Sequence, residues 1–298
     1  MPTDVPPRAP DPGELIARIR GLRGDLSTVE QRVADQLLAD PAAASQRSIT
    51  DLAGECGASE TTIVRFCRRV GFDGYRRFRL ALAAAAAQGT HPTDRDLGSD
   101  IGRDDPLRTV VKKVGASEVR AVEDTVAQLD TGTLEAVVAA LVAAPRLEVF
   151  GVGASGLVAE DLQQKLHRIG RAAFVSRDPH AALTSAALLE PGDAAIGISH
   201  TGKTRDTIDP LRVAAQHGAT TIAITNASRA PLARAAAHVL TTAAVETTFR
   251  SGAMSSRIAQ LVVVDSLFVG VAQHTYEDTL AALSVTFEAV RDRREGGT

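Results

Sequence analysis

The 298-residue sequence predicts an α + α/β fold, in which an N-terminal all-α domain precedes a doubly wound parallel-sheet domain. Two observations support this fold class. Between residues 14 and 88 apolar residues recur at helical spacing, without a strand-like run. From Arg146 onward short apolar runs alternate with helical patterns, which is typical of right-handed crossovers in a parallel sheet covered on both faces.

Composition excludes several classes of protein. Hydrophobic residues make up 44% and charged residues 23%, as in ordinary globular proteins. Aromatic residues make up only 3%, which argues against a platform that stacks single-stranded bases. Cys56 and Cys67 are interpreted as small buried hydrophobes, and the seven histidines lack ligand spacing, so we expect neither a metal nor a cofactor.

Targeting signals are also missing from the sequence pattern. No run approaches the roughly 20 apolar residues that cross a bilayer. The first 13 residues are rich in proline and lack the apolar centre of a signal peptide. We therefore expect a cytoplasmic protein.

The chain divides into four predicted parts. Residues 1–13 form a disordered tail, and residues 14–88 form a helix-turn-helix domain. Residues 89–106 are polar and contain several glycines and prolines, which is typical of a linker. Residues 107–298 form the sheet domain.

The helices of the first domain are predicted from spacing and capping residues. One spans 14–22, and a second begins at Ser27, where Ser27 and Glu30 form a capping box, and ends before Pro41. Three more are predicted at 48–56, 59–70 and 76–88.

The sheet domain should begin with helices near 117–128 and 133–143. Strand-like runs then lie within 147–153, 172–176, 193–199, 220–225 and 238–242. Helical patterns separate them at 155–169, 180–189, 204–217 and 231–237, and two long helices at 252–272 and 275–294 follow.

The helices at 48–56 and 59–70 have the spacing of a helix-turn-helix motif. Gly57 lies between them and permits the steep crossing that places the second helix in a DNA major groove. The formal net charge is −3, but residues 65–79 hold six arginines against one aspartate, a local charge of +5. Such a stripe can neutralise phosphates, although a solvated helix face is the alternative interpretation.

The start of the second helix should read base edges, since this is how such motifs dock. We assign this role to Ser59, Glu60, Thr61, Thr62 and Arg65, with Arg65 as a bidentate guanine contact. Structural roles remain open for Ser59 as a helix cap and Glu60 at the helix dipole. The predicted contacts with the phosphate backbone are Arg68, Arg69, Arg76 and Arg77.

Two glycine-containing loops follow strands of the predicted sheet. The first, GVGASG, contains Gly151, Gly153 and Ser155, and it opens a helix whose free N–H groups favour an anion. The second, ISHTGKT, contains Ser199, Thr201, Gly202 and Thr204. Both loops follow the carboxyl ends of strands, where open α/β sheets bind ligands, so we predict a phosphate site.

Two alternatives to a phosphate site stay open. The first loop also matches GxGxxG, and Asp178 lies where an acid for a ribose is expected, so a dinucleotide site is one alternative. The second alternative is that both loops are merely structural glycine turns with capping hydroxyls.

The two halves together resemble a known family. The segment SETTIVRFCRRVGFDGYRRFRLALA resembles the DNA-binding module of RpiR-type regulators, and the GxGxS and ISxTGxT loops resemble those of SIS (sugar isomerase) domains. The resemblance covers nearly the whole chain except the tail and linker. It implies a sugar phosphate effector held by Ser155, Ser199, Thr201 and Thr204.

The same resemblance suggests weaker candidates and one departure. Glu246 and Arg250 are candidates for contacts with the sugar, and Lys203 adds a cation beside the second loop. Asp206 stands where many relatives carry glutamate.

The resemblance implies a repressor of carbohydrate metabolism genes that binds double-stranded DNA at a palindromic operator. We expect a homodimer or homotetramer assembled through the SIS domains. The alternative function is a sugar-phosphate aldose–ketose isomerase, for which Glu246, His200 and His180 are candidate bases.

Overall fold

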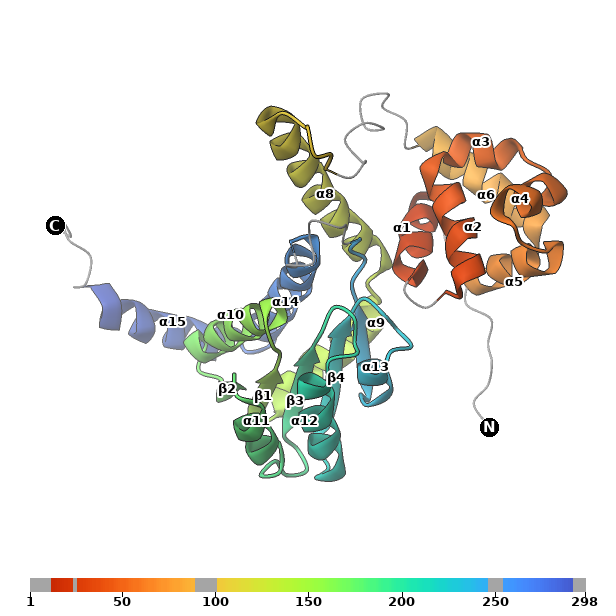
Figure 1. Cartoon of the computed structure of the whole chain (residues 1–298). Helices are drawn as coiled ribbons and strands as arrows, with labels where there is room; N and C mark the ends of the chain where they lie inside the picture. Colours follow the sequence, from red (N-terminus) through yellow and green to blue (C-terminus); the bar gives the residue numbers. More distant parts are fainter. Residues whose placement is uncertain (1–11, 24–25, 89–100, 246–253, 292–298) are drawn as a thin grey trace. The chain divides into compact units, whose positions relative to one another are not determined.

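The computed structural model describes residues 12–23, 26–88, 101–245 and 254–291 (Figure 1). By their contacts the described residues form two compact units. The first comprises those within Met1–Gln128 and Ala243–Ser256, and the second those within Leu129–Thr242 and Arg257–Thr298. The boundaries of the four parts given from the sequence stay a prediction.

The first unit is helical, as predicted. Its helices are α1 (Pro12–Leu22), α2 (Thr28–Ala39), α3 (Pro41–Gln46), α4 (Ile49–Cys56), α5 (Glu60–Val70), α6 (Tyr75–Gln88) and α8 (Leu107–Gln128). Helix α2 ends at Ala39, before Pro41, as predicted. A further helix, α3, was not predicted and begins at Pro41, where Asp40 caps it by accepting a hydrogen bond from the Ala43 N–H. Helix α8 begins at Leu107, ten residues before the predicted start at 117.

Aromatic rings form the centre of this helical core. Phe66 of α5 and Phe78 of α6 are fully buried and pack edge to face, with ring centroids 6.0 Å apart. Cys56 and Cys67 are free and buried, which confirms their interpretation as small hydrophobes. Burial raises the pKa of the Cys67 thiol to about 12, so this thiol stays protonated at neutral pH.

The second unit contains a five-stranded parallel sheet. Its strands are β1 (Leu147–Phe150), β2 (Ala173–Ser176), β3 (Ala194–Ile198), β4 (Thr220–Thr225) and β5 (His238–Thr241), in the order β2-β1-β3-β4-β5. The helices are α9 (Thr131–Ala143), α10 (Ala154–Arg168), α11 (Pro179–Ala186), α12 (Arg205–Gln216), α13 (Pro231–Arg234), α14 (Ser255–His274) and α15 (Tyr276–Arg291).

Helices cover both faces of the sheet, as the doubly wound class requires (Figure 1). Side chains alternate along each strand, so Val149 and Ile196 pack with residues of α9, α10 and α14. Phe150 and Ala195 face the other way and pack with residues of α11, α12 and α13. The two predicted helices at 180–189 and 231–237 are shorter than expected and end at Ala186 and Arg234.

Helix α14 is long and apolar enough, by length and composition alone, to cross a membrane. This run was not recognised from the sequence. Within the second unit, however, its Val263, Leu267 and Val271 side chains are completely buried in the core against the sheet. The apolar character of α14 is therefore explained by its position as a core helix.

Candidate functional site

Helix α5 presents a polar stripe on the side opposite its core. Its core side consists of Ile63, Phe66, Cys67 and Val70, which are buried. Thr61, Arg65 and Arg68 follow one another at helical spacing on the other side, and all three are exposed. This stripe contains the side chains that a recognition helix would present to a DNA groove.

The turn before α5 has the geometry expected of a helix-turn-helix. Gly57 caps α4 in the left-handed conformation, with φ = 56°, and its N–H donates to the carbonyls of Ala53 and Gly54. Ser59 then caps α5, because its hydroxyl accepts from the Thr62 N–H at 3.2 Å. The structural role of Ser59 is therefore real, and it leaves the side chain exposed beside the stripe.

Helix α2 holds both helices of the motif, which the sequence interpretation missed. The Arg32 guanidinium donates to the carbonyls of Cys56 at 3.0 Å and Gly57 at 3.1 Å, at the end of α4. The Glu30 carboxylate accepts from Arg65 at 3.3 Å and from Arg69 at 2.9 Å, on α5. Through Glu30 and Arg32, α2 therefore contacts both helices of the motif.

Glu30 holds two arginines of α5 from a buried position inside the unit. It is 2% exposed, whereas the Arg65 side chain is 65% exposed and that of Arg69 is 28% exposed. The Nε of Arg65 thus donates to the buried Glu30 carboxylate, while most of the Arg65 side chain remains exposed to solvent. Arg69 is the more enclosed of the two, which favours a role in joining α5 to α2.

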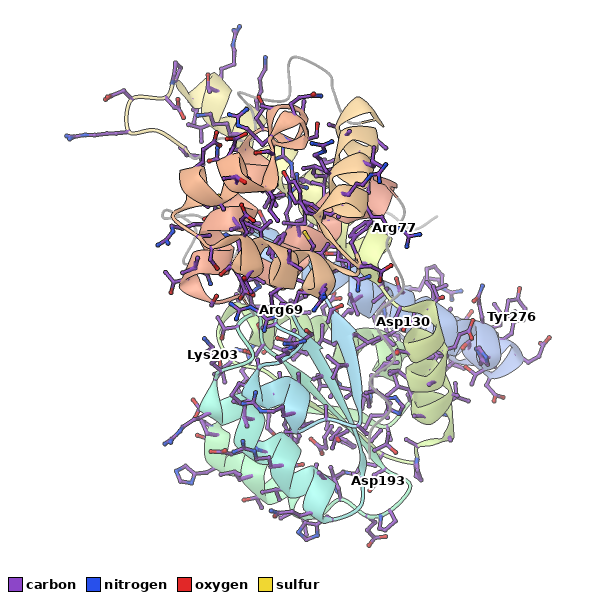
Figure 2. The ribbon with its side chains drawn as sticks, turned by 90° about the vertical axis from the view of Figure 1, so that its right-hand side faces the viewer. Arg69, Arg77, Asp130, Asp193, Lys203 and Tyr276 are labelled. Atoms are coloured by element: carbon purple, nitrogen blue, oxygen red, sulfur yellow. The ribbon has the colours of Figure 1, made fainter. Side chains whose placement is uncertain are left out.

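The remaining predicted DNA contacts lie on the same unit. Glu60 accepts from the Thr50 hydroxyl at 2.6 Å, which ties the start of α5 to α4. Arg76 and Arg77 are exposed at the start of α6, and Arg77 pairs with Asp73 at 2.8 Å. Figure 2 labels Arg69 and Arg77 on this unit.

The pKa of Glu30 gives the DNA-binding unit a pH dependence. Burial alone raises the pKa of this carboxyl, but hydrogen bonds from Ser27 and the charges of Arg69 and Arg65 outweigh burial and leave it below the ordinary value. A depressed pKa in the folded state stabilises the fold above the unfolded-state value, about 4.3. This contribution is lost as the pH falls through the folded-state pKa.

We therefore expect the free energy of unfolding to fall below about pH 4 more steeply in the wild type than in Glu30→Gln. Urea unfolding of the full chain, followed by circular dichroism between pH 7 and pH 3, measures both slopes. Identical slopes in the two proteins would contradict the assignment.

The two predicted phosphate loops lie side by side in the second unit. Strands β1 and β3 are hydrogen-bonded neighbours, with Phe150 paired with Gly197, so the loops at 151–156 and 199–204 leave the same edge. The chain goes from β1 to one side for β2 and to the other side for β3, which makes this the topological switch point. Figure 2 shows Lys203 and Asp193 at opposite ends of the sheet, and Lys203 marks the loop end.

Glycines shape both loops. Gly153 has φ = 59° and precedes α10 without a side-chain cap, and the N-terminus of a helix is a position that favours an anion. Gly151 permits a tight turn, because a Cβ there would lie 2.7 Å from the Ser155 carbonyl oxygen. Gly202 has φ = 61°, and a Cβ there would lie 2.5 Å from the Cβ of Ala230.

Hydroxyl groups of the second loop converge. The Ser199 and Thr204 hydroxyls lie 3.1 Å apart, and that of Ser199 also accepts from the Gly202 N–H at 3.2 Å. Thr201 accepts from the Lys203 N–H at 3.3 Å. Thr204 precedes α12 but makes no side-chain cap, so its hydroxyl is oriented toward Ser199 rather than toward the helix.

Gln260 joins the first loop, and nothing in the sequence pattern indicated it. The Ser155 hydroxyl donates to the Gln260 Oε1 at 3.3 Å, across 105 positions of sequence. Gln260 is 1% exposed, and its Nε2 has no hydrogen-bond partner among the described residues. A buried amide of this kind beside a glycine loop is suited to a ligand oxygen.

The structure accounts differently for the other candidates. Glu246 and Arg250 lie outside the described residues. Asp178, the candidate ribose acid, caps α11 by accepting from the Ala181 N–H at 2.9 Å, which gives it a structural role. His180 and Asp206 are exposed, whereas His200 is half-buried in the second loop. Within the described ranges no group of three or more metal-ligating residues is placed to hold an ion.

Two family models match the chain, in the domain order predicted from its sequence. A model described as a helix-turn-helix domain of the rpiR family matches residues 13–89. A model described as a SIS domain matches residues 140–270. The two matches contain the described parts of the α5 stripe and of both glycine loops.

Two relatives of nearly full length are described as HTH-type transcriptional regulators. An uncharacterized HTH-type transcriptional regulator of Caldanaerobacter subterraneus is 36% identical over 281 residues, which are 94% of this chain and 98% of the relative. Another, from Haemophilus influenzae, is 33% identical over 282 residues, which are 95% of this chain and 98% of the relative.

Solved structures show similarity in both halves. The Vibrio vulnificus NanR protein complexed with ManNAc-6P is 28% identical, with a TM-score of 0.60, and the match covers 95% of this chain and all of NanR. The sugar isomerase domain of an RpiR transcription factor from Sphaerobacter thermophilus is 32% identical, with a TM-score of 0.55, over 59% of this chain and 97% of that domain.

Proposed function

The chain belongs to the RpiR family of HTH-type transcriptional regulators, and on that premise we propose that it represses carbohydrate metabolism genes under the control of a sugar phosphate. The protein would act in the cytoplasm, where its operator lies. The alternative sugar-phosphate isomerase is not supported by these relatives, because both are regulators over nearly the whole chain.

The observation that supports the proposed effector is the convergence of two glycine loops at one switch point. The Ser199 and Thr204 hydroxyls lie 3.1 Å apart beside a left-handed glycine, and the neighbouring loop opens α10 without a side-chain cap. A phosphate could accept from these hydroxyls and from the N–H groups of the loops. The NanR relative, which is complexed with ManNAc-6P, supports a phosphorylated sugar as the class of ligand.

The proposed DNA contacts follow from the exposed stripe of α5. Arg65 would reach a guanine edge, while Arg68, Arg76 and Arg77 would bind phosphates. We further propose that the protein is a homo-oligomer on a palindromic operator, since two-fold symmetry would present paired α5 helices to two half-sites. Effector binding would then change operator affinity by about 5–150-fold, the range that corresponds to a coupling of about 1–3 kcal/mol.

The experiment that tests this proposal is fluorescence anisotropy on the DNA upstream of the protein's own gene, with competitor DNA present. A panel of sugar phosphates that includes ManNAc-6P is titrated into the complex. We expect one of them to change the affinity at least 5-fold. Specific binding that no panel member alters would contradict effector control, and turnover of a panel member would favour the isomerase.

Thr204→Val is expected to weaken the effector response about 10-fold or more and to leave operator affinity without effector unchanged. The substitution keeps the shape of the side chain but removes a hydroxyl bound to a charged group. Thr220→Val is the matched control, because Thr220 lies at the opposite edge of the sheet at the start of β4. Equal effector responses of the two variants would contradict the role of Thr204.

A further inference from the structure

Helix α15 carries two different stripes along its length. One includes the buried Thr279 and the half-buried Ala282 and Thr286, and it faces the helix's own unit, where α15 contacts α10. The second is turned about a quarter of the way around the helix. It consists of large apolar side chains that are between 37% and 59% exposed, namely Tyr276, Leu280, Leu283, Phe287 and Val290.

The exposed stripe has the spacing of a coiled-coil seam. Its members are separated by four, three, four and three residues, which is the alternation of a and d positions in a heptad repeat. A helix that only covers its own core needs no second seam, because its buried side already satisfies packing. Figure 1 shows the far half of α15 extending beyond α10.

We propose that this seam pairs with α15 of a second copy of the chain, with the two helices antiparallel. The inference rests on the homo-oligomer of the proposed function and names its surface. Charge complementarity favours a second copy as the partner. With Leu280 and Phe287 at a positions, Glu277, Ser284 and Arg291 occupy the successive e positions along one flank of the seam.

An antiparallel arrangement makes this flank self-complementary. The e positions of one helix then face the e positions of the other in reverse order, so Glu277 lies opposite Arg291 of the second copy. Two-fold symmetry repeats the pair, and Ser284 meets its own counterpart at the centre. The same register stacks Leu283 on Phe287 of the second copy and Leu280 on Val290. A parallel pair would leave Glu277 far from Arg291.

The first test is the mass of the full chain in solution without DNA, measured by sedimentation velocity over a concentration series. Leu283→Asp is expected to weaken association about 100-fold or more, because each interface would bury two unpaired carboxylates. Val285→Asp is the matched control, since Val285 is 69% exposed on the opposite side of the helix. Both substitutions lie on exposed surface, so the fold should tolerate them.

A charge exchange tests the antiparallel register. Glu277→Arg alone is expected to weaken association about 3–30-fold, and adding Arg291→Glu to it should restore wild-type association. Failure of the double variant to recover would overturn the antiparallel pairing.

A monomeric wild type, or equal association of Leu283→Asp and Val285→Asp, would overturn the interface itself. Effector binding is measured on the same samples. A variant that dissociates yet still binds the sugar phosphate supports the interface and the proposed function separately. If the wild type and all variants had the expected association states but none responded to the effector, the result would count against the proposed function and not against the interface.

Discussion

Gly202→Ala is expected to lower the free energy of unfolding by about 2–6 kcal/mol and to abolish the effector response. Gly202 has φ = 61°, which costs an alanine about 1–3 kcal/mol. The added Cβ would also lie 2.5 Å from the Cβ of Ala230 and 2.9 Å from the Thr225 Oγ1, and relief of such crowding costs about 1–3 kcal/mol more.

The effector response is lost because the same backbone shapes the phosphate loop. The Gly202 N–H donates to the Ser199 hydroxyl, and its carbonyl accepts from the Leu232 N–H at 3.0 Å. A loop displaced by the new methyl group would separate Ser199 from Thr204. Urea unfolding and effector titration of the same sample measure both effects.

Gly192→Ala provides the control for Gly202→Ala. Gly192 has φ = 103°, but no atom lies within 4 Å of an added Cβ. The free energy of unfolding of this variant should fall by only about 1–3 kcal/mol, and its effector response should be kept. If both variants lost the same stability, crowding at Ala230 and Thr225 would have no role.

Glu30→Ala is expected to destabilise the DNA-binding unit by about 3 kcal/mol and to weaken specific operator binding. Removal of this carboxylate breaks the capping box with Ser27 and leaves the partly enclosed Arg69 guanidinium without its buried partner. Arg65 loses its hydrogen bond to Glu30, so binding to DNA would have to order the Arg65 side chain, which costs conformational entropy. Thermal unfolding and anisotropy on the operator measure the two effects.

Glu55→Ala is the matched control for Glu30→Ala. Glu55 also accepts from an arginine, Arg47, at 2.6 Å, but this pair lies on the surface of the same unit. Exposed ion pairs contribute about 0–1 kcal/mol, so the control should lose little stability and no specificity. If Glu55→Ala lost as much stability as Glu30→Ala, the burial of Glu30 would not explain the destabilisation.

The two variants also show what the sequence could and could not predict. The capping box of Ser27 and Glu30 was predictable, because its signal spans four residues. That Glu30 also binds arginines 35 and 39 positions later was not, since only the packing of α2 on α5 brings them together. The contact of Ser155 with Gln260 was hidden for the same reason.

Neighbouring loops were predictable where a general rule of sheets applies. The carboxyl ends of parallel strands share one edge, so the loops after β1 and β3 were both predicted to lie at the edge where such sheets bind ligands. Element lengths were less well predicted. The first turns of α8, at 107–116, were not recognised, and Pro41, which follows the end of α2 as predicted, also begins the unpredicted α3.

The strand order β2-β1-β3-β4-β5 has a consequence for folding during synthesis on the ribosome. Every strand pair in this sheet is parallel and must wait for a crossover connection to be made, so the sheet should fold slowly. The helices between residues 12 and 88 depend on shorter-range contacts and leave the ribosome first. We therefore expect a nascent chain to fold its helix-turn-helix before its parallel sheet is complete.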